Sequence, residues 1–404
     1  MRPKAISIAA ASAAVLVSGI FCSSGNSIIS DNIANAEIQT RLLLEASEEG
    51  DTIRIPSSFQ KGEVVFVPAS DWVSGFFAGT LWYMYELTGD EFWAEHARKQ
   101  TEALEDIQYL TWHHDVGFMI YDSYGNGLRL KNIDGYKDVC INAAKSLSTR
   151  FRPAAGILQS WNVDGGWQSE RGWKCPVIID NMMNLEILFK ATEFSGDPTF
   201  AGIATSHADK TLKNHFRPDW SSYHVVDYDP ETGEVLKKCT AQGYADESAW
   251  SRGQAWALYG FTAAYRCTAD KKYLDAAENV AGFILSHPNM PEDLVPYWDF
   301  NAPDIPDEPR DASSAAIIAS GLYELYGHTG KDIYREKADK IICSLSTPAY
   351  RAAQGTNGGF ILMHSVGSIP HGNSIDVPLN YADYYFLEAL IRKRNIEAGL
   401  PPVE

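Results

Sequence analysis

The stretch that decides the fold is residues 83–97, YMYELTGDEFWAEHA, in which a short turn separates two amphipathic segments. Three related stretches follow along the chain: residues 188–204 (LFKATEFSGDPTFAGIA), 263–277 (AAYRCTADKKYLDAA) and 322–338 (LYELYGHTGKDIYREKA). In all four, an aromatic residue comes three positions after an Asp or Lys, and an alanine follows four positions later. Repeats of this kind indicate units that bury a core only when they are stacked together.

Each copy carries the signals of a helical hairpin. A Gly or Ala suits the C-terminal cap of the first helix, and Asp90, Asp197 or Asp270 then suits a turn or the N-cap of the second helix. The aromatic residue and the alanine share one helix face because they are four positions apart. At roughly 50–60 residues per hairpin, the chain after residue 24 holds about six or seven hairpins. We therefore predict an all-α fold, a closed ring of six inner and six outer helices, with an open solenoid as the alternative.

Composition limits the partners that the protein can have. The chain has 404 residues, of which 45% are hydrophobic, and its net charge is −18. This acidity disfavours binding to nucleic acid and electrostatic docking on an anionic membrane. No break in composition indicates a second domain, so residues 25–404 are expected to form a single domain. We expect a monomer or a weak homodimer.

The N-terminus predicts export. Arg2 and Lys4 precede a mostly apolar run over residues 5–21, which is typical of a secretory signal peptide and short for a transmembrane helix. Cys22 stands where a lipoprotein signal places its acylated cysteine, although Phe21 is a poor residue before it. We therefore interpret residues 1–24 as a signal peptide. After export, the protein is expected to be either free in the periplasm or anchored by lipid at the cell envelope. No later run is long enough to span a membrane.

Two acidic residues are candidates for catalysis. Asp115 occupies a turn after His113 and His114, and Asp180 follows the apolar residues 177–179. Asp180 is either a helix N-cap or a desolvated acid with a raised pKa, and Asp115 alone is as readily a turn residue. Two carboxylates from separate loops are the minimum for acid–base chemistry on a sugar. Adjacent histidines rarely bind one ion together, and no Cys-x-x-Cys or nucleotide-binding motif occurs, so we expect no metal and no cofactor.

A third candidate is the polar and aromatic segment 240–257, TAQGYADESAWSRGQAWA. Arg252 and Trp256 are four positions apart and share a helix face, while Trp250 lies nearby on another. These residues form either a surface cation–π pair or an arginine that binds a carboxylate beside a tryptophan platform for a sugar ring. The residues alone therefore indicate an exported, all-α, carbohydrate-active protein.

Several motifs together resemble the unsaturated glucuronyl hydrolases, glycoside hydrolase family 88. They are DWVSGFFAG (71–79), HDVGF (114–118), IDNMMN (179–184), QGY (242–244), RGQAW (252–256) and IDVPLNYADYY (375–385). The resemblance runs from about residue 40 to residue 392. It implies an (α/α)6 barrel of six helical hairpins that removes a 4,5-unsaturated uronic acid from the non-reducing end of lyase-generated glycosaminoglycan oligosaccharides.

The resemblance also implies roles for individual residues. Asp180 would protonate C4 of the C4=C5 double bond and help activate a water at C5, and Asp115 would hold the ring hydroxyls and tune the charge of Asp180. The residues implied in substrate binding are His224 and Gln242 near the water and ring, Thr240, Arg252 and Trp256 at the uronate, Trp72 and Trp250 stacked on the sugar, and Ser365 and Ser368 at the next sugar.

One departure bears on specificity. Some members of the family follow these serines with a basic residue suited to a sulfate, whereas Ile369 and Pro370 follow here. A preference for sulfated disaccharides is therefore in doubt. The alternatives are an unsaturated rhamnogalacturonyl hydrolase, an ordinary inverting glycosidase, and a non-catalytic glycan-binding protein whose acids are only caps.

Overall fold

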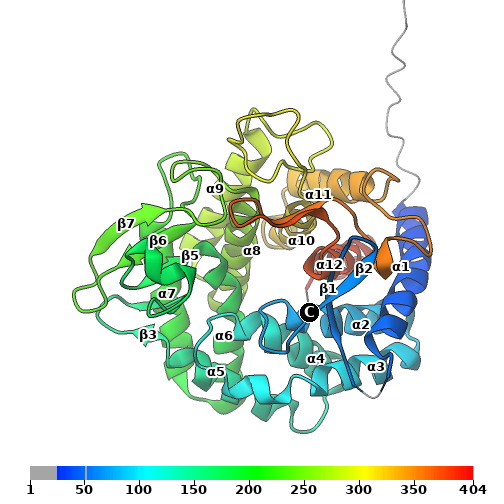
Figure 1. The fold of residues 1–404 in the computed structure, drawn as a ribbon, viewed down its shortest axis with the longest axis horizontal. Helices are drawn as coiled ribbons and strands as arrows, with labels where there is room; N and C mark the ends of the chain where they lie inside the picture. Colours follow the sequence, from blue (N-terminus) through cyan, green and yellow to red (C-terminus); the bar gives the residue numbers. More distant parts are fainter. Residues whose placement is uncertain (1–24, 51, 404) are drawn as a thin grey trace, which may run out of the picture.

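A closed double ring of helices forms the body of the protein (Figure 1). The computed structural model describes residues 25–50 and 52–403, and the predicted signal peptide lies outside them. The inner ring consists of α2 (Ser74–Thr88), a π-helical segment (Gly117–Gly125) that continues into α4 (Asn126–Lys131), α6 (Glu186–Ser195), α8 (Ser251–Thr268), α10 (Ala312–Thr329) and α12 (Asn380–Glu397). The outer ring consists of α1 (Gly25–Ser47), α3 (Glu91–Glu102), α5 (Tyr136–Ser148), α7 (Pro198–Asn214), α9 (Lys271–Ser286) and α11 (Asp332–Leu345). Because α12 packs against α2, the ring closes, and the predicted barrel is confirmed.

The repeated stretches form the hairpin turns that the sequence predicts. The first helix of each pair ends at a residue in the left-handed conformation, which is Gly89, Gly196, Ala269 or Gly330. The next residue begins the second helix, and in three of the turns an Asp side chain accepts a backbone N–H there. In the fourth turn, Lys331 makes no such cap. The four repeated aromatics and alanines are buried between the rings: Trp93, Phe200, Tyr273, Tyr334, Ala97, Ala204, Ala277 and Ala338.

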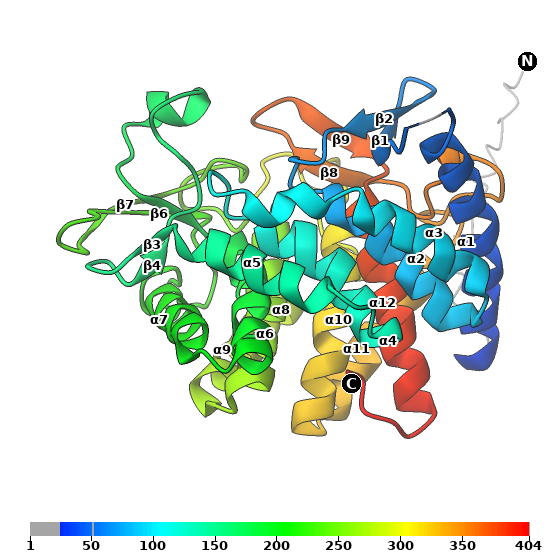
Figure 2. The same cartoon turned by 90° about the horizontal axis from the view of Figure 1, so that it is seen from below.

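Short antiparallel strands occupy the connections between helices. They are β1 (Ile55–Gln60) with β2 (Glu63–Val67), β3 (Phe151–Arg152) with β4 (Ile157–Leu158), β5 (Pro176–Ile178) with β6 (Val225–Tyr228) and β7 (Val235–Cys239), and β8 (Ser365–Ser368) with β9 (Asn373–Val377). Figure 2 shows β1, β2, β8 and β9 at one end of the barrel and the C-terminus at the opposite end. The connections between the helices therefore include small sheets.

One expectation about the loops is wrong. The polar composition of residues 112–130, with its Gly, His and Trp, predicts a loop, but residues 117–131 form one side of the inner ring. Gly127 explains the difference, because a Cβ there would lie 2.6 Å from the ring of Tyr136, so the glycine permits close helix packing. Within the described residues, no helix is both long and apolar enough to cross a membrane.

Candidate active site

The connections at the strand-bearing end of the barrel enclose a cavity of about 740 Å³. Its walls come from the starts of inner helices, from the turn after β5 and from the β8–β9 hairpin. A cavity of this size, with polar and aromatic walls, suits a small oligosaccharide. Among the predicted site residues, those that line it are Trp72, Asp115, Asp180, Gln242, Arg252 and Ser368.

Asp180 lies in a 3-10 turn, Ile179–Asn184, that follows β5 directly. Ile178 occupies the N-cap position of this turn, so Asp180 is a desolvated acid and not a cap. Its side chain is buried, with the residue 7% exposed. Burial raises the pKa of Asp180 to about 7; the Arg252 guanidinium opposes this rise and the Asp115 carboxylate adds to it. Asp180 can therefore hold a proton near neutral pH, as a general acid must.

Asp115 is held beside this turn by the side chain of Asn184, and the ring of His113 accepts its backbone N–H. The amide nitrogen of Asn184 donates to Asp115 Oδ1 at 3.0 Å, and the rings of His113 and His114 lie 3.2 and 3.4 Å from the carboxylate oxygens. The amide oxygen of Asn184 accepts the backbone N–H of Phe118 at 3.0 Å, so one residue ties the two catalytic segments together. The close approach requires glycine at position 117, where a Cβ would lie 2.5 Å from Asn184 Oδ1.

His224 faces Asp180 as a neutral hydrogen-bond donor. Its Nδ1 accepts the backbone N–H groups of Ala241 and Gln242 at 3.0 and 3.2 Å. The ring proton is therefore on Nε2, which lies 3.7 Å from Asp180 Oδ2. Burial holds the pKa of His224 well below its ordinary value, and nearby Arg252 lowers it further. His224 can thus donate to a water or a sugar hydroxyl across the pH range in which Asp180 titrates.

Three neighbouring polar atoms in this region are buried without partners. They are Asp180 Oδ2, His224 Nε2 and the indole nitrogen of Trp256. Buried polar atoms without partners are uncommon in folded proteins, since each one costs free energy. Their grouping around the raised-pKa acid indicates a place for a polar ligand and a water.

Arg252 links the barrel to the β8–β9 hairpin. Its guanidinium donates to the carbonyls of Val366 and Gly367 and lies 3.3 Å from Asp311. The same group stacks 4.5 Å from the ring centre of Trp250. Arg252 therefore fixes the cavity wall and also supplies a buried positive charge near Asp180, and its Nε has no partner.

Five of the predicted binding residues are not among those that line the cavity: His224, described above, and Thr240, Trp250, Trp256 and Ser365. Trp250 is only 3% exposed, and its ring packs against Arg252 and His224. The hydroxyl of Thr240 accepts the backbone N–H of Gly243 instead of facing the cavity. Trp256 and Ser365 are buried, each with an unpartnered polar atom.

Two tryptophans of the cavity wall were not singled out from the sequence. Trp161 and Trp167 form an aromatic wall, and the ring of His371 packs 4.8 Å from that of Trp167. The Oγ of Ser368 pairs with His371 Nδ1 at 2.7 Å. The density of tryptophan in residues 160–175 was the available signal, but it does not show which rings face the cavity.

Comparison with known proteins agrees with this geometry. The profile of Glycosyl Hydrolase Family 88 matches residues 52–277. The chain is 48% identical to an unsaturated glucuronyl hydrolase of Formosa agariphila, over 82% of each chain. It is 34% identical to an unsaturated chondroitin disaccharide hydrolase of Streptococcus pneumoniae, over 80% of this chain and 82% of the other.

Solved structures show the same relation. A heparin-specific unsaturated glucuronyl hydrolase superposes with a TM-score of 0.88 at 44% identity, covering 92% of this chain and 98% of the other. The chain therefore belongs to glycoside hydrolase family 88. Its activity is that of an unsaturated glucuronyl hydrolase, which removes an unsaturated uronic acid from the non-reducing end of an oligosaccharide. Among the described residues, no group of His, Cys, Asp or Glu is arranged to hold a metal ion.

Proposed function

We propose that the protein performs this reaction by hydrating the C4=C5 double bond, with Asp180 as the acid. The carboxyl proton of Asp180 passes to C4, and positive charge develops at C5 and the ring oxygen. A water then attacks C5 and gives its proton to the Asp180 carboxylate, which restores the acid. The resulting hemiketal opens to a C5 ketone, and the glycosidic bond breaks as a consequence, without displacement at C1.

The observation that carries this proposal is the raised pKa of Asp180 beside a buried, fixed carboxylate. Protonation of an enol ether needs a neutral acid at working pH, and burial of Asp180 supplies one. The Nε2–H of neutral His224 is directed at Asp180 and can orient the attacking water. Asp115 is held by Asn184, so its oxygens are placed to accept from sugar hydroxyls.

We infer that the substrates are lyase-generated glycosaminoglycan oligosaccharides. A structural relative from Streptococcus agalactiae is complexed with dGlcA-GalNAc6S, and another relative is specific for heparin. In this chain, the β8–β9 hairpin places Ser368 and His371 at the cavity, and the pKa of His371 is lowered by burial and by Arg171. With Ile369 and Pro370 between them, the hairpin itself supplies no Lys or Arg for a sulfate, and the cation near His371 is Arg171. We therefore expect unsulfated disaccharides to react at least as fast as sulfated ones.

The test follows the ultraviolet absorbance of the conjugated double bond. The protein is added to unsaturated disaccharides from hyaluronan, chondroitin and heparin, each with and without sulfate. Loss of absorbance on the unsulfated disaccharides supports the proposal and ranks the three sources. Reaction of unsaturated rhamnogalacturonan fragments alone would contradict the substrate class, and no reaction on any unsaturated substrate would favour a glycan-binding role.

We also propose that the protein acts outside the cytoplasm, either free in the periplasm or anchored by lipid at Cys22, as a monomer or weak homodimer. The charged and apolar pattern of residues 1–21 supports export. Cell fractionation of the full chain and of Cys22→Ala tests this. A membrane-bound parent and a released variant would support the anchor, a periplasmic parent would support the free form, and a cytoplasmic parent would contradict export. Sedimentation of the purified protein measures its oligomeric state.

A further inference from the structure

The active-site cavity opens to solvent between two loops. Asp180 is buried in the cavity wall, whereas Asp164 and His371, which also line the cavity, are exposed. The exposed residues belong to the segment 161–168 and to the β8–β9 hairpin, and these loops touch where the rings of His371 and Trp167 pack 4.8 Å apart. This part of the cavity is therefore its mouth.

Arg171 stands beside this mouth on a cluster of tryptophans. It is the last residue of the 3-10 turn Trp167–Arg171, and it is exposed. Its guanidinium carbon lies 5.5 Å from the ring centre of Trp167 and 5.6 Å from that of Trp173, within the range of a cation–π interaction. Trp173 is buried and stacks 5.7 Å from Trp161, so the rings that contact Arg171 are packed into the protein. The guanidinium is thus held at a defined place beside the mouth.

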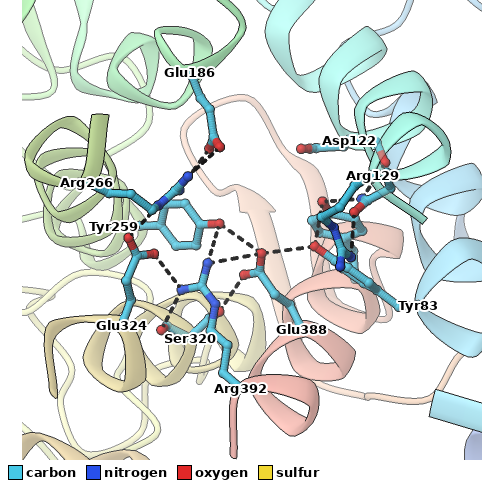
Figure 3. A network of polar contacts seen from close by, with 12 residues as sticks. Tyr83, Asp122, Arg129, Glu186, Tyr259, Arg266, Ser320, Glu324, Glu388 and Arg392 are labelled. Atoms are coloured by element: carbon cyan, nitrogen blue, oxygen red, sulfur yellow. Dashed lines mark hydrogen bonds and ion pairs between the residues drawn. The ribbon is translucent and has the colours of Figure 1, made fainter. Parts of the chain in front are cut away.

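The positive charge of Arg171 is left free, in contrast to that of other arginines at the two ends of the barrel. Arg252, in the cavity wall, lies 3.3 Å from Asp311. Figure 3 shows the far end of the barrel, opposite the active site, where buried arginines pair with carboxylates: Arg266 with Glu186 and Glu324, and Arg392 with Glu324 and Glu388. Among the described residues, Arg171 has no such ion pair, although the chain has a net charge of −18. A free cation beside the mouth of a substrate cavity fits an anionic group of the substrate.

The reaction fixes the direction in which a substrate lies. The unsaturated uronate at the non-reducing end must reach the buried Asp180, so the following sugars extend toward the mouth. Uronates and amino sugars alternate in lyase-generated glycosaminoglycan oligosaccharides, so the second sugar is an amino sugar and the third is a uronate. Arg171 is not among the residues that line the cavity, so a group that binds it must extend past the cavity. The third sugar is the first one after the unsaturated uronate to bring a carboxylate there.

We propose that Arg171 binds the carboxylate of the third sugar in unsaturated glycosaminoglycan oligosaccharides longer than a disaccharide. This inference rests on the proposed function and extends its substrates to longer chains. A guanidinium can donate two parallel hydrogen bonds to a carboxylate, and Trp167 and Trp173 restrict Arg171 before the substrate arrives. The third sugar is remote from the double bond, so its binding strengthens the complex without changing the chemical step. Arg171 therefore lowers KM and leaves kcat unchanged.

Unsaturated di- and tetrasaccharides from unsulfated hyaluronan, chondroitin and heparin test the proposal. Loss of ultraviolet absorbance gives KM and kcat, and the comparison uses the source whose disaccharide reacts fastest. Because exposed ion pairs contribute modestly, we expect a KM about three- to fivefold lower for the tetrasaccharide than for the disaccharide. Arg171→Ala should abolish this difference, while the KM of the disaccharide and both kcat values stay as in the parent. Unchanged turnover of the disaccharide also shows that the variant is folded.

A second variant and a second substrate serve as controls. Lys237→Ala removes an exposed positive charge from β7, outside the cavity lining, and should leave every value unchanged. The tetrasaccharide dGlcA-Glc-Rha-Glc carries a neutral rhamnose as its third sugar. Arg171→Ala should therefore act on it at the same rate as the parent.

Each contrary result has a distinct meaning. A preference for the glycosaminoglycan tetrasaccharide that persists in Arg171→Ala, or that the parent lacks, would overturn the inference and leave the proposed function intact. An equal loss with dGlcA-Glc-Rha-Glc or in Lys237→Ala would show that the third carboxylate is not what Arg171 binds. Slower hydrolysis by Arg171→Ala of sulfated disaccharides alone would assign Arg171 to a sulfate on the second sugar, which also contradicts the inference. No reaction of any disaccharide would contradict the proposed function itself and this inference with it.

Discussion

Replacement of Asp180 by Asn separates the chemical role of this residue from its structural role. Asparagine has the shape of a protonated aspartic acid but cannot transfer a proton. The cavity walls and the hydrogen bond from Asn184 that holds Asp115 do not depend on the Asp180 proton. We therefore expect Asp180→Asn to bind substrate with a similar KM and to lose about 10²–10⁴-fold in kcat, which is the typical contribution of a general acid.

The same substitution has a calculable effect on stability. The pKa of Asp180 is about 7, against an ordinary value of 3.8. A raised carboxyl pKa means that ionisation is harder in the folded state, so the folded protein is penalised as pH rises from 3.8 and the penalty is complete above about 7. At about 1.4 kcal/mol per pKa unit, the full penalty is on the order of 4 kcal/mol. Asp180→Asn should remove this penalty. The variant should therefore be more stable than the parent at pH 8, with a much smaller difference at pH 4.

Two assays measure these effects. The absorbance of the unsaturated disaccharide gives kcat and KM, and denaturant unfolding at pH 4 and pH 8 gives the stability difference. Asp383→Asn is a matched control, because burial also raises the pKa of Asp383 to about 7 but that carboxyl accepts backbone N–H groups away from the active site. Parent-like kcat in Asp180→Asn, or a stability gain independent of pH, would refute the reasoning.

Three further outcomes are expected. Asp115→Asn removes a charge that raises the pKa of Asp180, so the loss of kcat/KM at alkaline pH should begin at lower pH; an unchanged pH profile would argue against this coupling. Gly117→Ala places a Cβ 2.5 Å from Asn184 Oδ1, so it should cost about 1–3 kcal/mol of stability. It should also lower kcat by displacing Asp115. Unfolding and rate measurements that match the parent would contradict the close approach. Asp270→Ala removes an N-cap in the third repeat and should cost about 1 kcal/mol in denaturant unfolding without a change in kcat, whereas no change in stability would show that the cap contributes little.

The barrel could be predicted because the signals for its hairpin turns lie in residues that are adjacent in the sequence. Gly89 and Asp90 stand side by side in the chain, so their capping roles can be read without knowing what packs against them. Lys331 shows the limit of this reasoning, since the fourth turn forms without a side-chain cap. The segment 117–131 was misjudged because its glycines serve helix packing, and their neighbours are distant in the sequence.

The active site could be predicted only in part for the same reason. The roles of Asp115 and Asp180 came from their motifs, and the structure places both in one cavity. Whether Trp250 faces a sugar or supports Arg252 depends on the side of α8 that the β8–β9 hairpin covers, and no local pattern contains that contact. The network at the far end joins residues of α6, α8, α10 and α12, so it exists only once the ring has closed.

Isotope labelling of the reaction tests the central claim most directly. The unsaturated disaccharide is treated with the protein in deuterium oxide, and separately in ¹⁸O-labelled water, and the products are examined by NMR and mass spectrometry. Hydration with Asp180 as the acid predicts deuterium at C4 and ¹⁸O at C5 of the released uronate, with the original glycosidic oxygen retained on the other sugar. Product that carries ¹⁸O at C1, without deuterium at C4, would contradict it and assign direct hydrolysis of the glycosidic bond.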